Sequence, residues 1–137
     1  MLSIVSRRRF LSAASAAVAA LALPWERAWA RSATPHPTPR PGITGANVLT
    51  REQLADYPKL IPLFDSIRAI PEIVDGIRCN CGCTNPPAYY SLLSCFEGKA
   101  MARDCVVCQG QGRLAARLHA EGKTLDQIRV AIDAKFG

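Results

Sequence analysis

Six cysteines lie between positions 79 and 108, and none lies elsewhere in the chain of 137 residues. Thiolates bind soft metal ions and attack disulfides, and two thiols in an oxidising compartment form a disulfide. We therefore expect the chemistry of this protein in that segment. The candidate ligands are Cys79, Cys81, Cys83, Cys95, Cys105 and Cys108.

The first three cysteines alternate with other residues in Cys79-Asn80-Cys81-Gly82-Cys83. In an extended backbone, alternate side chains point to the same side, so the three sulfurs would lie together. Gly82 allows the loop to bend and bring the outer sulfurs closer. This pattern is typical of a loop that offers two or three thiolates to one ion.

A second spacing is Cys105-Val106-Val107-Cys108. We predict that it begins a helix, where residues three apart share a face. The exposed N–H groups and the helix dipole at that end stabilise thiolates and lower their pKa. Such a pair suits metal binding or thiol–disulfide exchange.

Three interpretations of the cysteines compete. Structural disulfides are common in small exported domains, but a Cys-x-Cys bridge is strained, so Cys79, Cys81 and Cys83 would each need a distant partner. A metal site would favour Cu(I) over Zn²⁺, because Cu(I) accepts two or three thiolates and the spacings are not the usual pairs of a Cys₄ zinc site. The third interpretation is thiol–disulfide exchange by Cys105 and Cys108.

We favour the metal site as the prediction. The ion, Cu(I) ahead of Zn²⁺, is expected between the Cys79–Cys83 loop and the Cys105/Cys108 pair, with Cys95 structural or a peripheral ligand. The protein would store, buffer or transfer the metal, with a metal-accepting or thiol protein as a partner. The sequence holds no Ser-His-acid set, no catalytic carboxylate pair and no phosphate loop, so we do not expect an enzyme.

The elements that must position these thiols are predicted to be helices. Residues 62–70 and 71–74 each begin with a proline, and Pro87 is expected to start a helix through Cys95. A helix over residues 104–121 should end at Gly122, and Thr124 should cap the last helix with Gln127 in a capping box. No segment shows sustained alternation of apolar and polar residues, so the fold class is all-α, with an irregular cysteine loop and a C-terminal helical hairpin.

The first thirty residues predict a twin-arginine signal peptide. Ser6-Arg7-Arg8-Arg9-Phe10-Leu11 is followed by an apolar run that ends at Leu23 and is shorter than the roughly 20 residues that span a bilayer. Ala28-Trp29-Ala30 is a small-x-small cleavage site, which would leave Arg31 as the mature N-terminus. We expect a periplasmic or extracellular protein with no stable membrane anchor. The twin-arginine route carries folded proteins, which favours a metal acquired before export.

Residues 31–46 predict a flexible tether, because four prolines alternate with polar residues, and residues 47–137 predict the cysteine-rich domain. His36 in the tether is expected to be exposed. The formal charge is +6 for the whole chain, and half of that belongs to the signal peptide. The remaining charges are mixed in sign, so we expect no nucleic-acid partner.

Four segments of the chain carry a resemblance to a known family: Ile70-Pro71-Glu72-Ile73-Val74-Asp75-Gly76, the triple-cysteine loop, Cys95-Phe96 and Cys105-Val106-Val107-Cys108. The family that they resemble is named for its Pro-Cys-Tyr-Cys-Gly-Cys motif. The resemblance covers roughly residues 55–137. Arg78 stands where the motif has proline, and Asn80 where it has tyrosine, while all three cysteines are present. Members are small exported proteins, often lipoproteins, so the resemblance implies an architecture and a thiol cluster.

A second resemblance concerns about thirty C-terminal residues. It is carried by Cys105-Val106-Val107-Cys108-Gln109-Gly110-Gln111, followed by a helix, Gly122 and Ile128. These residues are similar to the cytochrome c maturation thiol reductases. That family has a small three-helix periplasmic domain with a Cys-x-x-Cys pair. It lacks the triple-cysteine loop, and the resemblance implies the exchange chemistry named above as the alternative.

Overall fold

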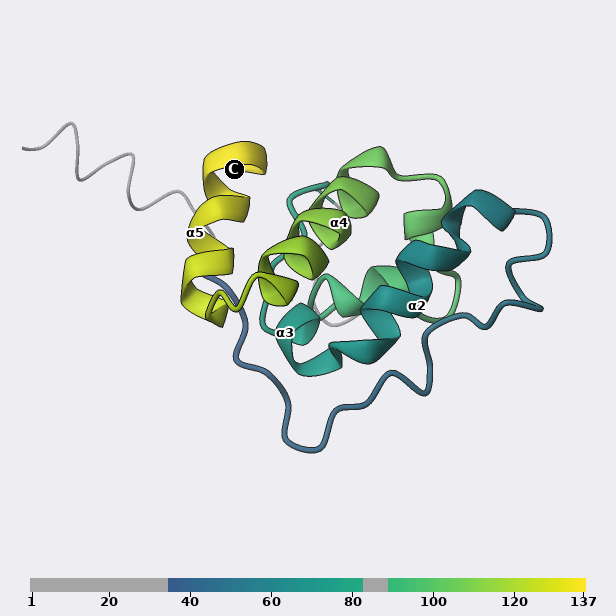
Figure 1. Cartoon of the computed structure of the whole chain (residues 1–137), viewed down its shortest axis with the longest axis horizontal. Coiled ribbons are helices and arrows are strands. Elements are labelled where there is room, and N and C mark those ends of the chain that lie inside the picture. Colours follow the sequence, from purple (N-terminus) through teal and green to yellow (C-terminus); the bar gives the residue numbers. More distant parts are fainter. Residues whose placement is uncertain (1–34, 83–88) are drawn as a thin grey trace, which may run out of the picture. The chain divides into compact units, whose positions relative to one another are not determined.

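The computed structural model describes residues 35–82 and 89–137 (Figure 1). The predicted signal peptide, the first residues of the predicted tether, Cys83 and the expected helix start at Pro87 lie outside the described residues. In the described part the elements are all helical, and the only pairing of extended backbone is an isolated bridge between Val48 and Glu97. The all-α fold class is therefore confirmed. The elements are η1 (Pro58–Leu60), α2 (Ile61–Ala69), α3 (Pro71–Asp75), η2 (Leu93–Phe96), η3 (Met101–Arg103), α4 (Val106–Ala120) and α5 (Leu125–Phe136).

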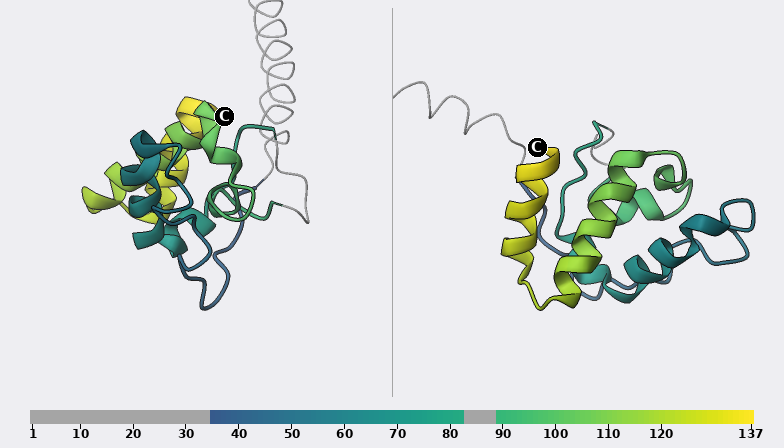
Figure 2. Two further views of the ribbon diagram at one scale, coloured as in Figure 1. Left: turned by 90° about the vertical axis from the view of Figure 1, so that its right-hand side faces the viewer. Right: turned by 45° about the horizontal axis from the view of Figure 1, so that its top comes forward.

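The C-terminal hairpin forms as predicted. The chain reverses after α4 at Gly122, whose φ of 81° lies in the left-handed region that glycine adopts without strain. Thr124 caps α5, and both hydrogen bonds of the capping box with Gln127 are present. Ile128 and Ile132 are fully buried, so α5 packs its apolar face on the rest of the domain, beside α4 (Figures 1 and 2).

Helix α2 lies across α4 from α5 (Figures 1 and 2). Helix α3 packs on both α2 and α4, and Arg129 of α5 bonds the Gly76 carbonyl at the end of α3. Helix α2 buries Leu63, Phe64 and Ile67, and the Phe64 ring meets Phe96 of η2 edge-on at 4.9 Å. Gly112 of α4 allows the close approach here, because a Cβ at this position would lie 2.8 Å from the Phe96 ring. The core of the domain therefore sits between α2, α4 and η2.

The helix predicted to run through Cys95 is wrong in its described part. Residues 89–92 are irregular, and only the 3₁₀ turn η2 follows. The reason is a long-range pairing: the Leu92 N–H donates to the Ile77 carbonyl at 2.7 Å instead of to a carbonyl four residues earlier. Residues 51–56 form turns, and Thr50 and Gln53 make the two hydrogen bonds of a capping box before them.

Residues 35–46 differ from the predicted tether. Their backbone is irregular, as the prolines predict, but it is bound to the domain, which forms one compact unit from Pro35 to Gly137. Arg40 makes three hydrogen bonds to the buried carboxylate of Asp75, and the Tyr90 hydroxyl donates to the Thr38 carbonyl. A solvated tether was expected because the sequence does not reveal Asp75 as its binding site.

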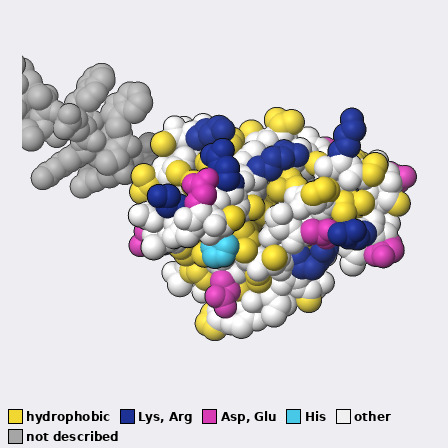
Figure 3. Space-filling view, in the orientation of Figure 1, with side chains coloured by type: hydrophobic (Ala, Val, Ile, Leu, Met, Phe, Trp, Pro, Cys, Tyr) yellow, Lys and Arg dark blue, Asp and Glu magenta, His cyan; other side chains and the backbone are white. Residues whose placement is uncertain are grey.

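Charges on the surface are mixed, as the composition indicates. On the face drawn in Figure 3, basic and acidic side chains alternate with hydrophobic ones. Within the described ranges, none of the helices combines the length and the apolar character needed to cross a membrane.

Candidate metal centre

Four cysteine sulfurs meet in the interior of the domain. The Sγ atoms of the group all lie within 4.8 Å of one another. Three of the side chains are at most 1% exposed, and all four belong to the apolar core or pack against it. We call this set the four-cysteine group: Cys79, Cys81, Cys95 and Cys108.

Three separate elements supply these sulfurs. Cys79 and Cys81 lie on the irregular segment that follows α3, Cys95 lies on η2, and Cys108 lies in the first turn of α4. The hydrogen bond between Leu92 and Ile77 joins the first two elements. Cys79 lies two residues after Ile77 and Cys95 three residues after Leu92, so this bond brings the two cysteines near each other. The group is therefore a product of the tertiary fold and not of one local motif.

The predicted ligand set is only partly brought together. Cys95, expected to be structural or peripheral, is fully buried and belongs to the group. Cys105, expected as a principal ligand, lies outside it and caps α4, where its Sγ accepts the Cys108 N–H at 3.3 Å. Cys83 lies outside the described residues.

Hydrogen bonds set the protonation of the group. Cys108 lies 3.3 Å and Cys81 3.1 Å from Cys79, sulfur to sulfur. Hydrogen bonds from Cys108 and Cys95 lower the pKa of Cys79 to about 4, which favours its thiolate. A hydrogen bond with Cys108 lowers the pKa of Cys95, but its bond to Cys79 and its burial outweigh that and raise this pKa to about 12. The pKa of Cys108 is also raised, chiefly because its proton is held by Cys79.

The donor set fits a soft ion in type and in size. With metal–sulfur bonds of about 2.3 Å, sulfurs around a tetrahedral ion lie about 3.8 Å apart. The closest described sulfur pairs are shorter than this by roughly half an ångström, so loading would need only a small expansion. Cys81 is disulfide-bonded in this structure and would join the ligands only after reduction. Four cysteines thus lie close together and could hold a metal ion.

The first turn of α4 adds positive potential beside the group. Cys108 is the third residue of this helix of 15 residues. The N–H groups of a first turn lack carbonyl partners within the helix, and the helix dipole favours negative charge there. The N-terminus of α4 therefore offsets part of the cost of holding thiolates in the core.

Gln111 fixes the backbone on both sides of Cys79. Its side chain is fully buried one turn beyond Cys108. Its Oε1 accepts the Asn80 N–H at 3.0 Å, and its Nε2 donates to the Arg78 carbonyl at 3.2 Å. One α4 side chain thereby sets the register of the Cys79 segment against Cys108.

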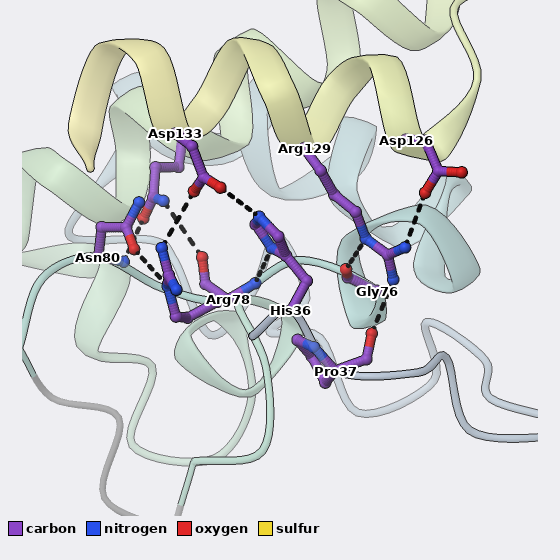
Figure 4. Close-up of polar contacts among 9 residues, drawn as sticks. His36, Pro37, Gly76, Arg78, Asn80, Asp126, Arg129 and Asp133 are labelled. Atoms are coloured by element: carbon purple, nitrogen blue, oxygen red, sulfur yellow. Dashed lines mark hydrogen bonds and ion pairs between the residues drawn. The ribbon is translucent and has the colours of Figure 1, made fainter. Parts of the chain in front are cut away.

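A polar network continues from there to α5 and to the N-terminal segment (Figure 4). The Arg78 guanidinium bonds Asp133 at 3.1 Å and the Asn80 side chain at 2.7 Å. His36 Nδ1 accepts the Arg78 N–H, while His36 Nε2 bonds Asp133 at 3.0 Å. The side chain of His36 is 13% exposed, so the expectation of an exposed histidine is wrong.

The two positions that depart from the Pro-Cys-Tyr-Cys-Gly-Cys motif are thus both used in this network. A proline at position 78 would have no N–H to give to His36 and no guanidinium for Asp133. Sequence reasoning missed Gln111, Arg78 and His36 as supporting residues. The one available signal was a glutamine three residues past Cys108, on the face of the helix that the cysteine marks.

Comparison with known proteins adds no relative: no family model, no curated protein and no solved structure matches this chain. Fold and site define it as a small all-α protein with a buried four-cysteine group that could hold a metal ion.

Proposed function

We propose that this chain is an exported protein that binds a soft metal ion, Cu(I) in preference to Zn²⁺, for storage, buffering or transfer. The observation that carries the proposal is the convergence of four sulfurs from three elements within 4.8 Å. Thiolate sulfurs are the ligands that soft metal ions prefer, so a buried group of this kind suits such an ion. The proposed role is binding and not catalysis.

The state of Cys81 supports Cu(I). While Cys81 is disulfide-bonded, the group offers three thiol sulfurs, from Cys79, Cys95 and Cys108. Soft thiolates select Cu(I), which accepts two or three of them, whereas a structural zinc site is almost always four-coordinate. Reduction of Cys81 would complete a set of four sulfurs, which suits Zn²⁺. We therefore propose Cu(I) as the ion of the oxidised protein.

Export is part of the proposal because of the sequence before residue 31. The twin-arginine pattern at Arg7 and Arg8, the short apolar run and the Ala28-Trp29-Ala30 site support it. The likeness to the Pro-Cys-Tyr-Cys-Gly-Cys family, whose members are small exported proteins, points the same way. In that setting the natural partner is a protein that delivers the ion or receives it.

Metal analysis with matched variants tests this function. Protein purified after export is loaded with Cu(I) under anaerobic conditions, desalted and analysed for copper per chain. We expect one ion per chain in the parent and its loss in Cys79→Ser and Cys108→Ser, because each removes a sulfur of the three-thiol set. Cys105→Ser is the matched control, since that sulfur lies outside the group and serine keeps the helix cap.

Two results would reject the proposal. One is a parent protein that binds no Cu(I) and no Zn²⁺ after desalting. The other is unchanged stoichiometry in both variants of the group. Circular dichroism on every variant shows whether a variant that binds no metal is still folded. If Cys79→Ser or Cys108→Ser is unfolded, Cys95→Ala tests the same group with a less polar replacement.

A second candidate function, thiol–disulfide exchange, rests on one observation. The Cys79 sulfur, with its pKa lowered to about 4, lies 3.1 Å from the sulfur of the disulfide-bonded Cys81. A thiolate is the attacking group in such exchange. The earlier expectation placed this chemistry on Cys105 and Cys108, but Cys108 is fully buried and its pKa is raised. Metal-free protein whose Cys79 reacts rapidly with a small disulfide would favour this candidate.

A further inference from the structure

In the part of the chain that the structure describes, the three thiols of the four-cysteine group are closed to solvent. Cys79 is 1% exposed, and Cys95 and Cys108 are 0% exposed. Cys81 is partly exposed, but its sulfur is disulfide-bonded in this structure. An ion carried by a chelator or a protein in solution would therefore first meet a sulfur that is more exposed than these three.

Cys105 is a more exposed thiol next to the group. Its side chain is partly exposed, and the next residue, Val106, is 78% exposed. Within the helix end, the Cys105 Sγ accepts the Cys108 N–H at 3.3 Å. A partly exposed cysteine thus contacts the backbone of a member of the buried group.

We propose that Cys105 is the transfer ligand of this protein, the thiol through which a soft metal ion enters and leaves the buried group. This inference rests on the proposed metal-binding function. On entry, the Cys105 thiol gives its proton to water as its sulfur binds the ion and the donor ligand leaves. The ion then bonds the Cys108 sulfur, whose proton passes to water, while the bond to Cys105 breaks and that thiolate takes a proton back.

The position of Cys105 in α4 suits a transient ligand. It is the N-cap residue, with extended backbone, so its side chain is held at the helix end by the Cys108 N–H. The dipole of the helix stabilises the thiolate that the sulfur becomes when it takes up the ion. The cap hydrogen bond to a neutral or anionic sulfur can be made before and after the ion has passed inward.

The cap also gives a clean experiment. Serine is among the preferred N-cap residues, so Cys105→Ser removes the sulfur and keeps the cap, whereas Cys105→Ala removes both. The parent and the two variants are loaded with Cu(I), and the ion is withdrawn by excess of the Cu(I) chelator bathocuproine disulfonate. The readouts are copper per chain at equilibrium and the rate of copper transfer to the chelator.

We expect the same amount of copper per chain in all three proteins. Transfer to the chelator should be about 10-fold slower or more in both variants, since removing a group next to metal ligands lowers affinity or activity about 10–100-fold. Equal slowing in the serine and alanine variants assigns the effect to the sulfur, because only alanine loses the cap. The change should be absent in Val107→Ala, a variant beside Cys105 that keeps every thiol.

Three results overturn the inference and stay distinct. Transfer at the parent rate in Cys105→Ser would show that the thiol is not on the route. Loss of bound copper in Cys105→Ser would make Cys105 a resident ligand instead of a transfer ligand. A parent protein that binds no soft metal would reject the proposed function itself, and this inference with it.

Discussion

Asp75 shows how one buried side chain ties the N-terminal segment to the domain. Its carboxylate is 0% exposed and accepts hydrogen bonds from the Arg40 backbone, the Arg40 guanidinium and the Ser91 hydroxyl. Burial raises the pKa of Asp75, but the bonds from Arg40 and Ser91 outweigh it, so this pKa lies below its ordinary value. A buried charge that is fully bonded in this way stabilises the fold only while it is ionised.

The first prediction concerns the pH dependence of that contribution. Because the folded pKa is lowered, the stabilisation is present above the unfolded pKa of about 3.9 and is lost as pH falls through the folded pKa. We expect Asp75→Asn to lower the free energy of unfolding at pH 7 by roughly 2–3 kcal/mol, the size of hydrogen bonds to a charged group. The deficit relative to the parent should shrink below about pH 4. Urea unfolding at several pH values measures both.

Asp126→Asn is the control for Asp75→Asn. Asp126 pairs with Arg129 on the surface and is 87% exposed, so its loss should change the free energy of unfolding by less than about 1 kcal/mol at any pH. A deficit of Asp75→Asn that persists unchanged at low pH would contradict the assignment to the ionised carboxylate.

At the scale of elements, the agreement between sequence and structure follows the range of the interactions. The α4–α5 hairpin was predictable because apolar spacing, a cap and Gly122 all act within a few residues. The cysteine spacings also indicated a cluster. Which cysteines belong to the cluster was not predictable from the spacings. Cys95 lies in it because Leu92 pairs with Ile77, and Cys105 lies outside it because its sulfur caps α4.

The second prediction tests how α4 sets the position of the cysteine segment. Gln111→Leu keeps a similar volume but leaves the Asn80 N–H and the Arg78 carbonyl without their partner. We expect a loss of about 2–3 kcal/mol in unfolding free energy, since buried polar groups left unpaired are costly. Affinity for Cu(I) should fall about 10-fold, because Cys79 loses its fixed register. Competition with a colorimetric chelator measures the affinity.

Arg113→Leu, an equally apolar replacement on the exposed face of α4, is the control for Gln111→Leu. It should leave the affinity for Cu(I) unchanged. Folded Gln111→Leu that binds Cu(I) with the affinity of the parent would contradict this assignment. Gln111 would then support the fold alone and would not position Cys79.

For the whole molecule, the boundary of the domain lies earlier than the prolines indicate. In the segment from Pro35, Arg40 bonds Asp75. His36 bonds Arg78 and Asp133, and the Pro37 carbonyl accepts from Arg129 (Figure 4). A proline-rich composition predicts an extended chain, which is correct, but not whether that chain is solvated or bound. That depends on partners more than thirty residues away.

The third prediction follows from that boundary. A chain beginning at Ile43 should unfold with a free energy at least about 3 kcal/mol lower than one beginning at Arg31, because Asp75 would stay buried without its cation. Arg40→Ala in the longer chain should reproduce most of the loss. Equal unfolding midpoints for the two chains would mean that the segment is not bound in solution.

The central claim is that one soft ion lies among the sulfurs of Cys79, Cys95 and Cys108. X-ray absorption at the copper edge of the loaded protein tests it most directly, because it reports the type, number and distance of the atoms bound to the ion. The account predicts a shell of sulfur alone, three atoms at about 2.3 Å, reduced in number or lost in Cys108→Ser. A shell dominated by nitrogen or oxygen, or one unchanged in that variant, would contradict it.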